Sequence, residues 1–201
     1  MTIWYNIFVM FMKEIIEKLS KLNKTVSTME SCTGGSLAGA ITNIEGASEV
    51  FKYGAVTYSN EFKIKMGVSK EVIDEYSVYS MNTADEMSKN ISKFSNSNYG
   101  IGITGKLNRQ DINNMSGEDN IVYISVYDRD NDSFYNKKVT VIYKTREENK
   151  QFVIDNVIEL LGGILWRYII HWIKGWRSLY HMMKKKLRCI HVDQQYITMH
   201  I

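Results

Sequence analysis

The chain has 201 residues, with 44% hydrophobic and 23% charged side chains, which excludes a disordered protein and suffices for one ordinary α/β domain. The formal net charge of +3 is distributed unevenly. Residues 162–201 hold seven basic side chains and one acidic one, a charge of +6, so residues 1–161 carry −3. This change in composition is the clearest boundary in the sequence. The two cysteines, Cys32 and Cys189, make no disulfide framework and favour a reducing, cytoplasmic location.

The first eleven residues form an apolar N-terminal extension. No basic residue precedes the apolar run and no small-residue cleavage site follows it, which argues against a signal peptide. The run is also too short to span a bilayer. We expect a strand or helix that packs on the core, and Met12 stays open as an alternative start.

Helical and strand patterns alternate in the next part of the chain. Apolar residues at helical spacing predict a helix over residues 12–23, and a short apolar run predicts a buried strand over 25–30. Small residues predict a helix from about 34 to 44. Aromatic and β-branched residues predict a strand over 53–59.

Three side chains are candidates for helix N-caps in the middle of the chain. Asn60 and Ser69 precede short helical patterns, and Asn82 opens an amphipathic helix. A strand is predicted over residues 99–104. A polar loop rich in Asn, Asp and Gly follows over 106–120.

The last elements are a hairpin and a helix. Residues 121–127 and 134–144 predict two strands joined by a turn, and 147–161 predict a core helix. Strands that alternate with helices, together with one hairpin, predict an α/β sandwich with a mixed sheet.

The most informative motif joins the strand at 25–30 to the helix that follows it. Residues 30–35 read ESCTGG, so a hydroxyl (Ser31) and a thiol (Cys32) stand at the start of a helix. Backbone N–H groups at such a position favour an anion, which suits a nucleophile or a phosphate site. Two other interpretations stay open: Ser31 as an ordinary N-cap, and Cys32 as a small buried hydrophobe.

Residues 1–161 contain no histidine, which limits the bases that could activate a nucleophile. A lysine serves as a base when desolvation lowers its pKa. The candidate is Lys63, which follows the strand ending near Tyr58 at a second strand-to-helix junction. Ligands bind where such junctions gather at the carboxyl ends of strands. The alternative is that Lys63 is simply solvated.

Several segments together resemble the CinA C-terminal domain family, whose enzymatic members are nicotinamide-mononucleotide deamidases. They are ESCTGG at 30–35, GAS at 46–48, YGAVTYSN at 53–60 with Lys63, Gly67-Val68, and Thr104-Gly105. The resemblance covers residues 12–161 and leaves 162–201 outside it as a basic, aromatic tail.

The resemblance implies a single three-layer α/β/α domain with a mixed sheet. It implies hydrolysis of nicotinamide mononucleotide to nicotinate mononucleotide and ammonia, in pyridine nucleotide salvage, with no metal or organic cofactor. Carried over by position, Ser31 is the nucleophile, Lys63 its base, and Tyr58 assists the proton transfer. The implied substrate-binding residues are Cys32, Thr33, Gly34, Gly35, Thr104, Gly105 and Arg146, with Arg146 on the oxyanion or the phosphate.

One departure from the family concerns the loop after Thr104-Gly105. The family continues with Ile-Ala-Gly-Pro, whereas residues 106–111 read KLNRQD. The alternative function is therefore a catalytically degenerate nucleotide-binding or regulatory module.

We expect a small nucleotide as ligand, a homo-oligomer (dimer or trimer) and no nucleic-acid partner. For the tail at 162–201, with its KKK cluster at 184–186, a peripheral helix or a non-native extension is favoured over membrane contact.

Overall fold

The structure is a computed structural model that describes residues 2–111, 114–115 and 117–172. The chain divides into two compact units, Met1–Gly163 and Ile164–Ile201. The cationic cluster expected at 184–186 lies outside the described residues. None of the helices in the described residues combines the length and apolar character that crossing a bilayer requires.

The first unit is built on a five-stranded sheet with the order β2-β1-β3-β4-β5. Strand β1 pairs in parallel with β2 and β3, whereas β3–β4 and β4–β5 are antiparallel. This confirms the predicted mixed sheet and its hairpin. The strands are β1 (Val26–Glu30), β2 (Phe51–Val56), β3 (Tyr99–Gly105), β4 (Ile121–Asp128) and β5 (Ser133–Thr140).

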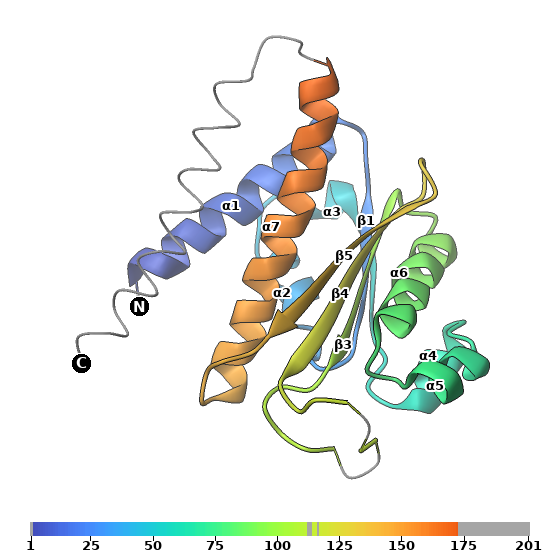
Figure 1. Ribbon diagram of the computed structural model, residues 1–201. Coiled ribbons are helices and arrows are strands. Elements are labelled where there is room, and N and C mark those ends of the chain that lie inside the picture. The colour runs from blue at the N-terminus through green and yellow to red at the C-terminus, as the bar shows by residue number, and fades with distance from the viewer. Residues whose placement is uncertain (1, 112–113, 116, 173–201) are drawn as a thin grey trace. The chain divides into compact units, whose positions relative to one another are not determined.

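Helices cover both faces of the sheet, as the predicted α/β/α architecture requires (Figure 1). On one face lie α1 (Thr2–Lys21), α2 (Ser36–Thr42) and the part of α7 (Arg146–Trp172) that belongs to the first unit, and on the other lies α6 (Met81–Ser95). Three short helices connect the strands: α3 (Ala47–Val50), α4 (Asn60–Lys65) and α5 (Lys70–Tyr76). Apolar side chains of α1, α2 and α7 meet those of β1 and β3 around one small void; they include Ile16, Leu19, Val26, Leu37, Ile101 and Val157.

The helix α6 packs against β3 closely enough to require glycine in the strand. A Cβ placed at Gly100 would lie 1.9 Å from the carbonyl oxygen of Ser88, and one at Gly102 would lie 2.2 Å from that of Ala84. Both atoms belong to the helix backbone and cannot move aside independently. The two glycines therefore set the distance between the helix and the sheet.

Several predicted helix boundaries are wrong: two starts by one or two residues, and the end of the helix expected at 147–161, which continues as α7 to Trp172. Ser59, not Asn60, caps α4 by accepting a hydrogen bond from the Phe62 N–H. Ser80, not Asn82, caps α6, whereas Ser69 caps α5 as predicted. At the N-terminus the apolar extension and the helix expected at 12–23 form one continuous helix, α1.

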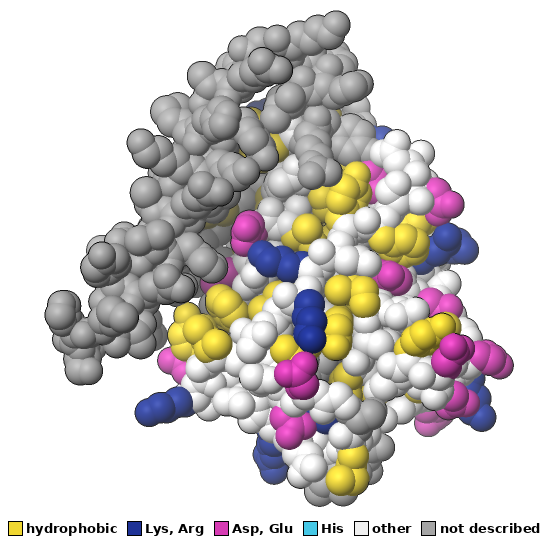
Figure 2. All heavy atoms as spheres, in the orientation of Figure 1, with side chains coloured by type: hydrophobic (Ala, Val, Ile, Leu, Met, Phe, Trp, Pro, Cys, Tyr) yellow, Lys and Arg dark blue, Asp and Glu magenta, His cyan; other side chains and the backbone are white. Residues whose placement is uncertain are grey.

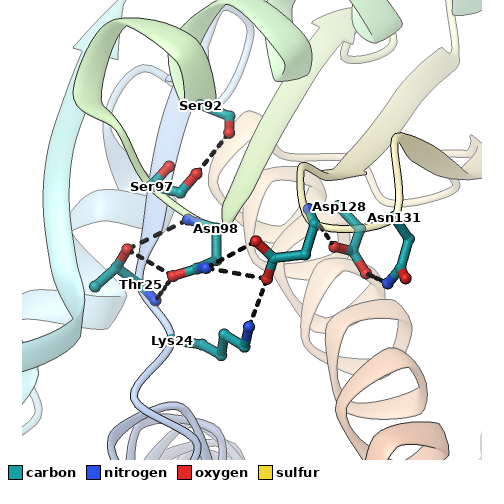
Figure 3. Close-up of polar contacts among 8 residues, drawn as sticks. Lys24, Thr25, Ser92, Ser97, Asn98, Asp128 and Asn131 are labelled. Carbon is teal, nitrogen blue, oxygen red and sulfur yellow. Dashed lines mark hydrogen bonds and ion pairs between the residues drawn. The ribbon is translucent and has the colours of Figure 1, made fainter.

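Polar side chains tie the amino ends of β1 and β3 to the β4–β5 turn (Figure 3). Asn98 Oδ1 accepts a hydrogen bond from the backbone N–H of Thr25 at 3.0 Å, and Asn98 Nδ2 donates to Asp130. Lys24 forms an ion pair with the same aspartate. This end of the sheet is therefore fixed by a structural network, which leaves the opposite end, at the carboxyl termini of the parallel strands, for a site.

The outer strand β5 is protected by charge. Lys137 pairs with Glu159 at 2.8 Å and Lys138 with Glu118 at 3.3 Å. Charged side chains on an edge strand discourage pairing with other chains. The face in Figure 2 likewise intersperses hydrophobic, basic and acidic side chains.

Candidate functional site

The two predicted catalytic side chains come from neighbouring parallel strands. Ser31 directly follows β1, and Lys63 lies on α4, which follows β2. Because β1 and β2 are parallel, with Glu30 opposite Val56, they end at the same edge of the sheet. The backbone N–H of Thr57 donates to the Glu30 carbonyl at 2.8 Å, which holds the two junctions side by side.

Lys63 and Ser31 are in direct contact. Lys63 Nζ donates a hydrogen bond to Ser31 Oγ at 3.0 Å and another to the Thr57 carbonyl oxygen at 2.7 Å. Lys63 is 1% exposed and Ser31 is 5% exposed. The solvated alternative for Lys63 is therefore wrong, and the dyad lies in a largely dehydrated environment.

Burial changes the ionisation of both candidate groups. It lowers the pKa of Lys63 from 10.5 to about 8, and the field of the Asp111 carboxylate opposes this shift. The neutral amine, the form that accepts a proton, is thus accessible near neutral pH. Burial raises the pKa of the Cys32 thiol to about 12, so this group stays protonated. Of the two side chains in the motif, Ser31 is the one whose proton has an adjacent acceptor.

The turn after Ser31 depends on its two glycines and on Glu30. Gly34 and Gly35 have φ angles of 63° and 90°, the left-handed region that favours glycine. The carboxylate of Glu30 is fully buried and accepts hydrogen bonds from the backbone N–H groups of Gly35, Leu37 and Ala38 at 2.8–3.1 Å. An internal carboxylate therefore occupies the start of α2.

This arrangement reduces the number of backbone N–H groups near Ser31 that could donate to a ligand or an oxyanion. The N–H of Gly34 donates to the Ser31 carbonyl and that of Gly35 to Glu30, so neither points to a ligand. Among the described residues, no backbone carbonyl accepts a hydrogen bond from the N–H of Cys32 or of Thr33. These two remain as candidates for stabilising an oxyanion next to Ser31.

The structure also brings Tyr58 and Arg146 together. Arg146, the first residue of α7, donates from Nη2 to the Tyr58 hydroxyl at 3.1 Å. Both side chains are exposed, and the field of Arg146 lowers the pKa of Cys32 against the larger effect of burial. Thr104, by contrast, is fully buried and donates its hydroxyl to the Val78 carbonyl at 2.8 Å. The Thr104 hydroxyl is thus engaged within the protein, and Gly105 is buried as well.

The loop that departs from the family pattern contributes a carboxylate that sequence reasoning missed. The hydroxyl of Tyr79 and the side chain of Asn114 both donate to Asp111 Oδ2, and Asn60 Nδ2 donates to Asn114 Oδ1 at 2.9 Å. Asp111 acts electrostatically on Lys63, and together with burial it raises the pKa of Tyr79. No motif in the polar loop distinguishes Asp111 from its neighbours.

The base of the same loop is fixed by a buried cation. Lys106 is 3% exposed, and its Nζ pairs with Asp119 at 2.9 Å. Its ammonium also lies over the ring of Tyr79, 5.3 Å from the centroid. Lys106 thus anchors the loop.

A cleft of about 580 Å³ adjoins this loop on the side of α5. It is lined by Asn60, Tyr79 and Asn114, the partners in the Asp111 network, and by residues 73–78 and Gly117. Its volume lies in the range of small-molecule sites. Across the described residues, no three His, Cys, Asp or Glu side chains gather in a way that would hold a metal ion.

Comparison with known proteins identifies a family. The model of the CinA C-terminal domain matches residues 10–165. A competence-damage inducible protein of Thermoanaerobacter sp. (strain X514) is 46% identical over 96 residues, 47% of this chain and 23% of the relative. One from Clostridium acetobutylicum is 51% identical over 82 residues, 40% of this chain and 20% of the relative. The matched segments thus span about a quarter or less of these relatives.

Solved structures agree with this assignment. The competence/damage inducible protein CihA from Agrobacterium tumefaciens superposes with a TM-score of 0.68 at 28% identity, covering 79% of this chain and 93% of that one. A CinA superfamily protein from Klebsiella pneumoniae superposes with a TM-score of 0.72 at 22% identity, covering 80% and 98%. The latter likeness concerns the fold alone.

Proposed function

The chain belongs to the CinA C-terminal domain family, and from this premise we propose that it deamidates nicotinamide mononucleotide to nicotinate mononucleotide and ammonia. The observation that carries the proposal is the buried hydrogen bond of 3.0 Å between Lys63 Nζ and Ser31 Oγ. An amide is a poor electrophile, so its hydrolysis requires an activated nucleophile and a proton for the leaving nitrogen. One serine and one lysine supply both.

In the acylation step, neutral Lys63 takes the proton of Ser31 while Oγ attacks the carboxamide carbon. The tetrahedral intermediate carries its negative charge on the former carbonyl oxygen, and in this proposal the N–H groups of Cys32 and Thr33 stabilise that charge. The carbon–nitrogen bond then breaks, and the proton held by Lys63 passes to the departing nitrogen. Ammonia leaves, and the acyl group remains as an ester on Ser31.

In the deacylation step, the same groups act on water. Lys63 takes a proton from a water molecule whose oxygen attacks the ester carbon. Collapse of the second tetrahedral intermediate breaks the bond to Oγ, and the proton returns from Lys63 to Ser31. The acid product ionises in solution. The hydrogen bond from Nζ to the Thr57 carbonyl keeps the amine oriented toward Oγ throughout the cycle.

Tyr58 and Arg146 take supporting roles in this proposal. Their hydrogen bond places a phenol and a guanidinium together at the exposed side of the site. An arginine at that position matches the geometry of a phosphate group. The reaction requires neither a metal ion nor an organic cofactor, because the dyad supplies the nucleophile and the base.

A second candidate is a nucleotide-binding module without turnover. The observation that favours it is Asp111, a carboxylate on the loop at 106–111 whose field stabilises the protonated form of Lys63. A protonated lysine cannot accept the proton of Ser31. This module would bind the nucleotide and gain thermal stability from it without releasing product.

Incubation of the full chain with nicotinamide mononucleotide separates the two candidates. The deamidase releases one ammonia for each nicotinate mononucleotide formed, which a coupled ammonia assay and chromatography of the nucleotide measure together. Nicotinamide itself, which lacks the ribose phosphate, serves as the comparison substrate. Stabilisation by the nucleotide with no ammonia release between pH 7 and 9 would reject the deamidase in favour of the binding module.

A further inference from the structure

The start of α2 is closed to a substrate anion. Its backbone donors at Gly35, Leu37 and Ala38 are taken by the Glu30 carboxylate, which is buried and negatively charged when ionised. A phosphate brought to this end of the helix would meet that carboxylate. The phosphate of a nucleotide bound at Ser31 therefore needs a cationic partner elsewhere.

Two basic side chains on α7 lie beside the turn that carries Ser31. Arg146 and Lys150 are four residues apart, so their side chains leave the same face of the helix. Arg146 reaches Tyr58, and Lys150 Nζ lies 3.4 Å from the position that a Cβ at Gly34 would occupy. Gly34 closes the turn onto Ser31 through its N–H bond to the Ser31 carbonyl at 3.1 Å. The two cations thus flank the turn that carries the nucleophile.

Several other basic side chains of the first unit form ion pairs. Lys65 pairs with Glu61 and Lys106 with Asp119. Within the described residues, neither Arg146 nor Lys150 has a carboxylate within ion-pair distance. Glu148, the acidic residue between them, accepts hydrogen bonds from the backbone and hydroxyl of Thr145. Positive charge is therefore left uncompensated beside the dyad.

We propose that Lys150 joins Arg146 in binding the phosphate of a nucleoside monophosphate, beside the turn that Gly34 forms next to Ser31. The inference rests on the proposed function for the identity of the rest of the substrate. It assigns Lys150, which the sequence motifs do not single out, as a specificity-determining residue. A guanidinium grips phosphate oxygens in a fork, and an ammonium adds a compact charge.

Binding, not turnover, tests this site. The Ser31→Ala protein is titrated with nicotinamide mononucleotide and with nicotinamide riboside, which differ only in the phosphate. We expect Lys150→Ala in this background to weaken binding of the mononucleotide about tenfold or more and to leave the riboside unchanged. Lys150→Arg retains most of the affinity, because the charge is kept.

The control variant is Lys93→Ala, which removes an exposed lysine on α6, on the other face of the sheet. It leaves both affinities unchanged. Inorganic phosphate provides a probe independent of the nucleoside: it raises the melting temperature of the parent protein and of Lys93→Ala more than that of Lys150→Ala.

Two results would overturn the site. One is that Lys150→Ala, folded by circular dichroism, keeps the parent's preference for the mononucleotide over the riboside. The other is that neither the mononucleotide nor phosphate binds the parent protein. Because these are binding measurements, a protein that binds the phosphate yet releases no ammonia refutes the deamidase and leaves the phosphate site standing.

Discussion

Replacing Lys63 with methionine removes a buried amine from the core of the dyad and tests its lowered pKa without any substrate. The pKa of Lys63 is about 8 in the folded protein because burial disfavours its charged form, against 10.5 for an ordinary lysine. Between these two pH values the folded state binds fewer protons than the unfolded state. Stability therefore rises with pH across this interval and is lower below it.

The size of this pH-dependent change in the free energy of unfolding follows from the shift in the Lys63 pKa, at roughly 1.4 kcal/mol per pH unit. Between pH 7 and pH 10, the free energy of unfolding of the parent protein gains on the order of 2–3 kcal/mol from Lys63 alone. Lys63→Met lacks this gain, whereas the tyrosines and the other lysines that titrate toward the upper end of this range are common to both proteins. The difference between the two stability curves isolates the lysine.

Urea unfolding at half-unit steps from pH 7 to 10 measures both curves. Lys65→Met is the matched control, because Lys65 lies two residues away on α4 with its side chain 58% exposed. Its curve is expected to run parallel to that of the parent. If the Lys63→Met curve also runs parallel to the parent, Lys63 keeps an ordinary pKa and the reasoning about its role as a base is refuted.

Three further substitutions test the surroundings of the dyad. Glu30→Gln leaves backbone donors of α2 without their carboxylate and should lower the free energy of unfolding by about 2 kcal/mol; a loss under about 0.5 kcal/mol would contradict its capping role. Gly102→Ala places a Cβ 2.2 Å from the α6 backbone and should lower the free energy of unfolding by more than about 4 kcal/mol or prevent folding. In the control Gly39→Ala the new Cβ meets nothing within 4 Å, so this variant should be neutral or stabilised by up to about 1 kcal/mol. Equal melting temperatures for the two variants would count against the close packing of α6 on β3. Asp111→Asn removes a negative charge that raises the pKa of Lys63, so the acidic limb of the pH profile of kcat/KM should move to lower pH. An acidic limb that stays in place or moves to higher pH would speak against a role for this carboxylate.

The fold was predictable because its signals are local. The apolar run at 25–30 and the periodic apolar face of the helix at 81–95 each depend on residues that are neighbours in sequence. The contact between Ser31 and Lys63 was predictable for a different reason. Both follow parallel strands, and parallel strands that pair side by side end at one edge.

The remainder of the site depends on contacts that local patterns do not encode. Asp111 meets Tyr79 across 32 residues through a loop without periodicity, and Lys150 meets the Gly34 turn from a helix at the far end of the chain. Glu30 could be read as a strand residue, whereas its side chain caps the next helix. The helix starts were displaced because Ser80 and Asn82 are both competent caps, and only packing decides between them.

The central claim is that Ser31, with Lys63 as its base, is the nucleophile that releases ammonia. Its most direct test is the rate of ammonia release from nicotinamide mononucleotide by the parent protein and by Ser31→Ala, Lys63→Ala and Cys32→Ala, each shown to be folded. The account predicts a loss of at least about 10³-fold for the first two and retention of activity by Cys32→Ala, whose thiol stays protonated. Activity that survives in Ser31→Ala and disappears in Cys32→Ala would contradict it.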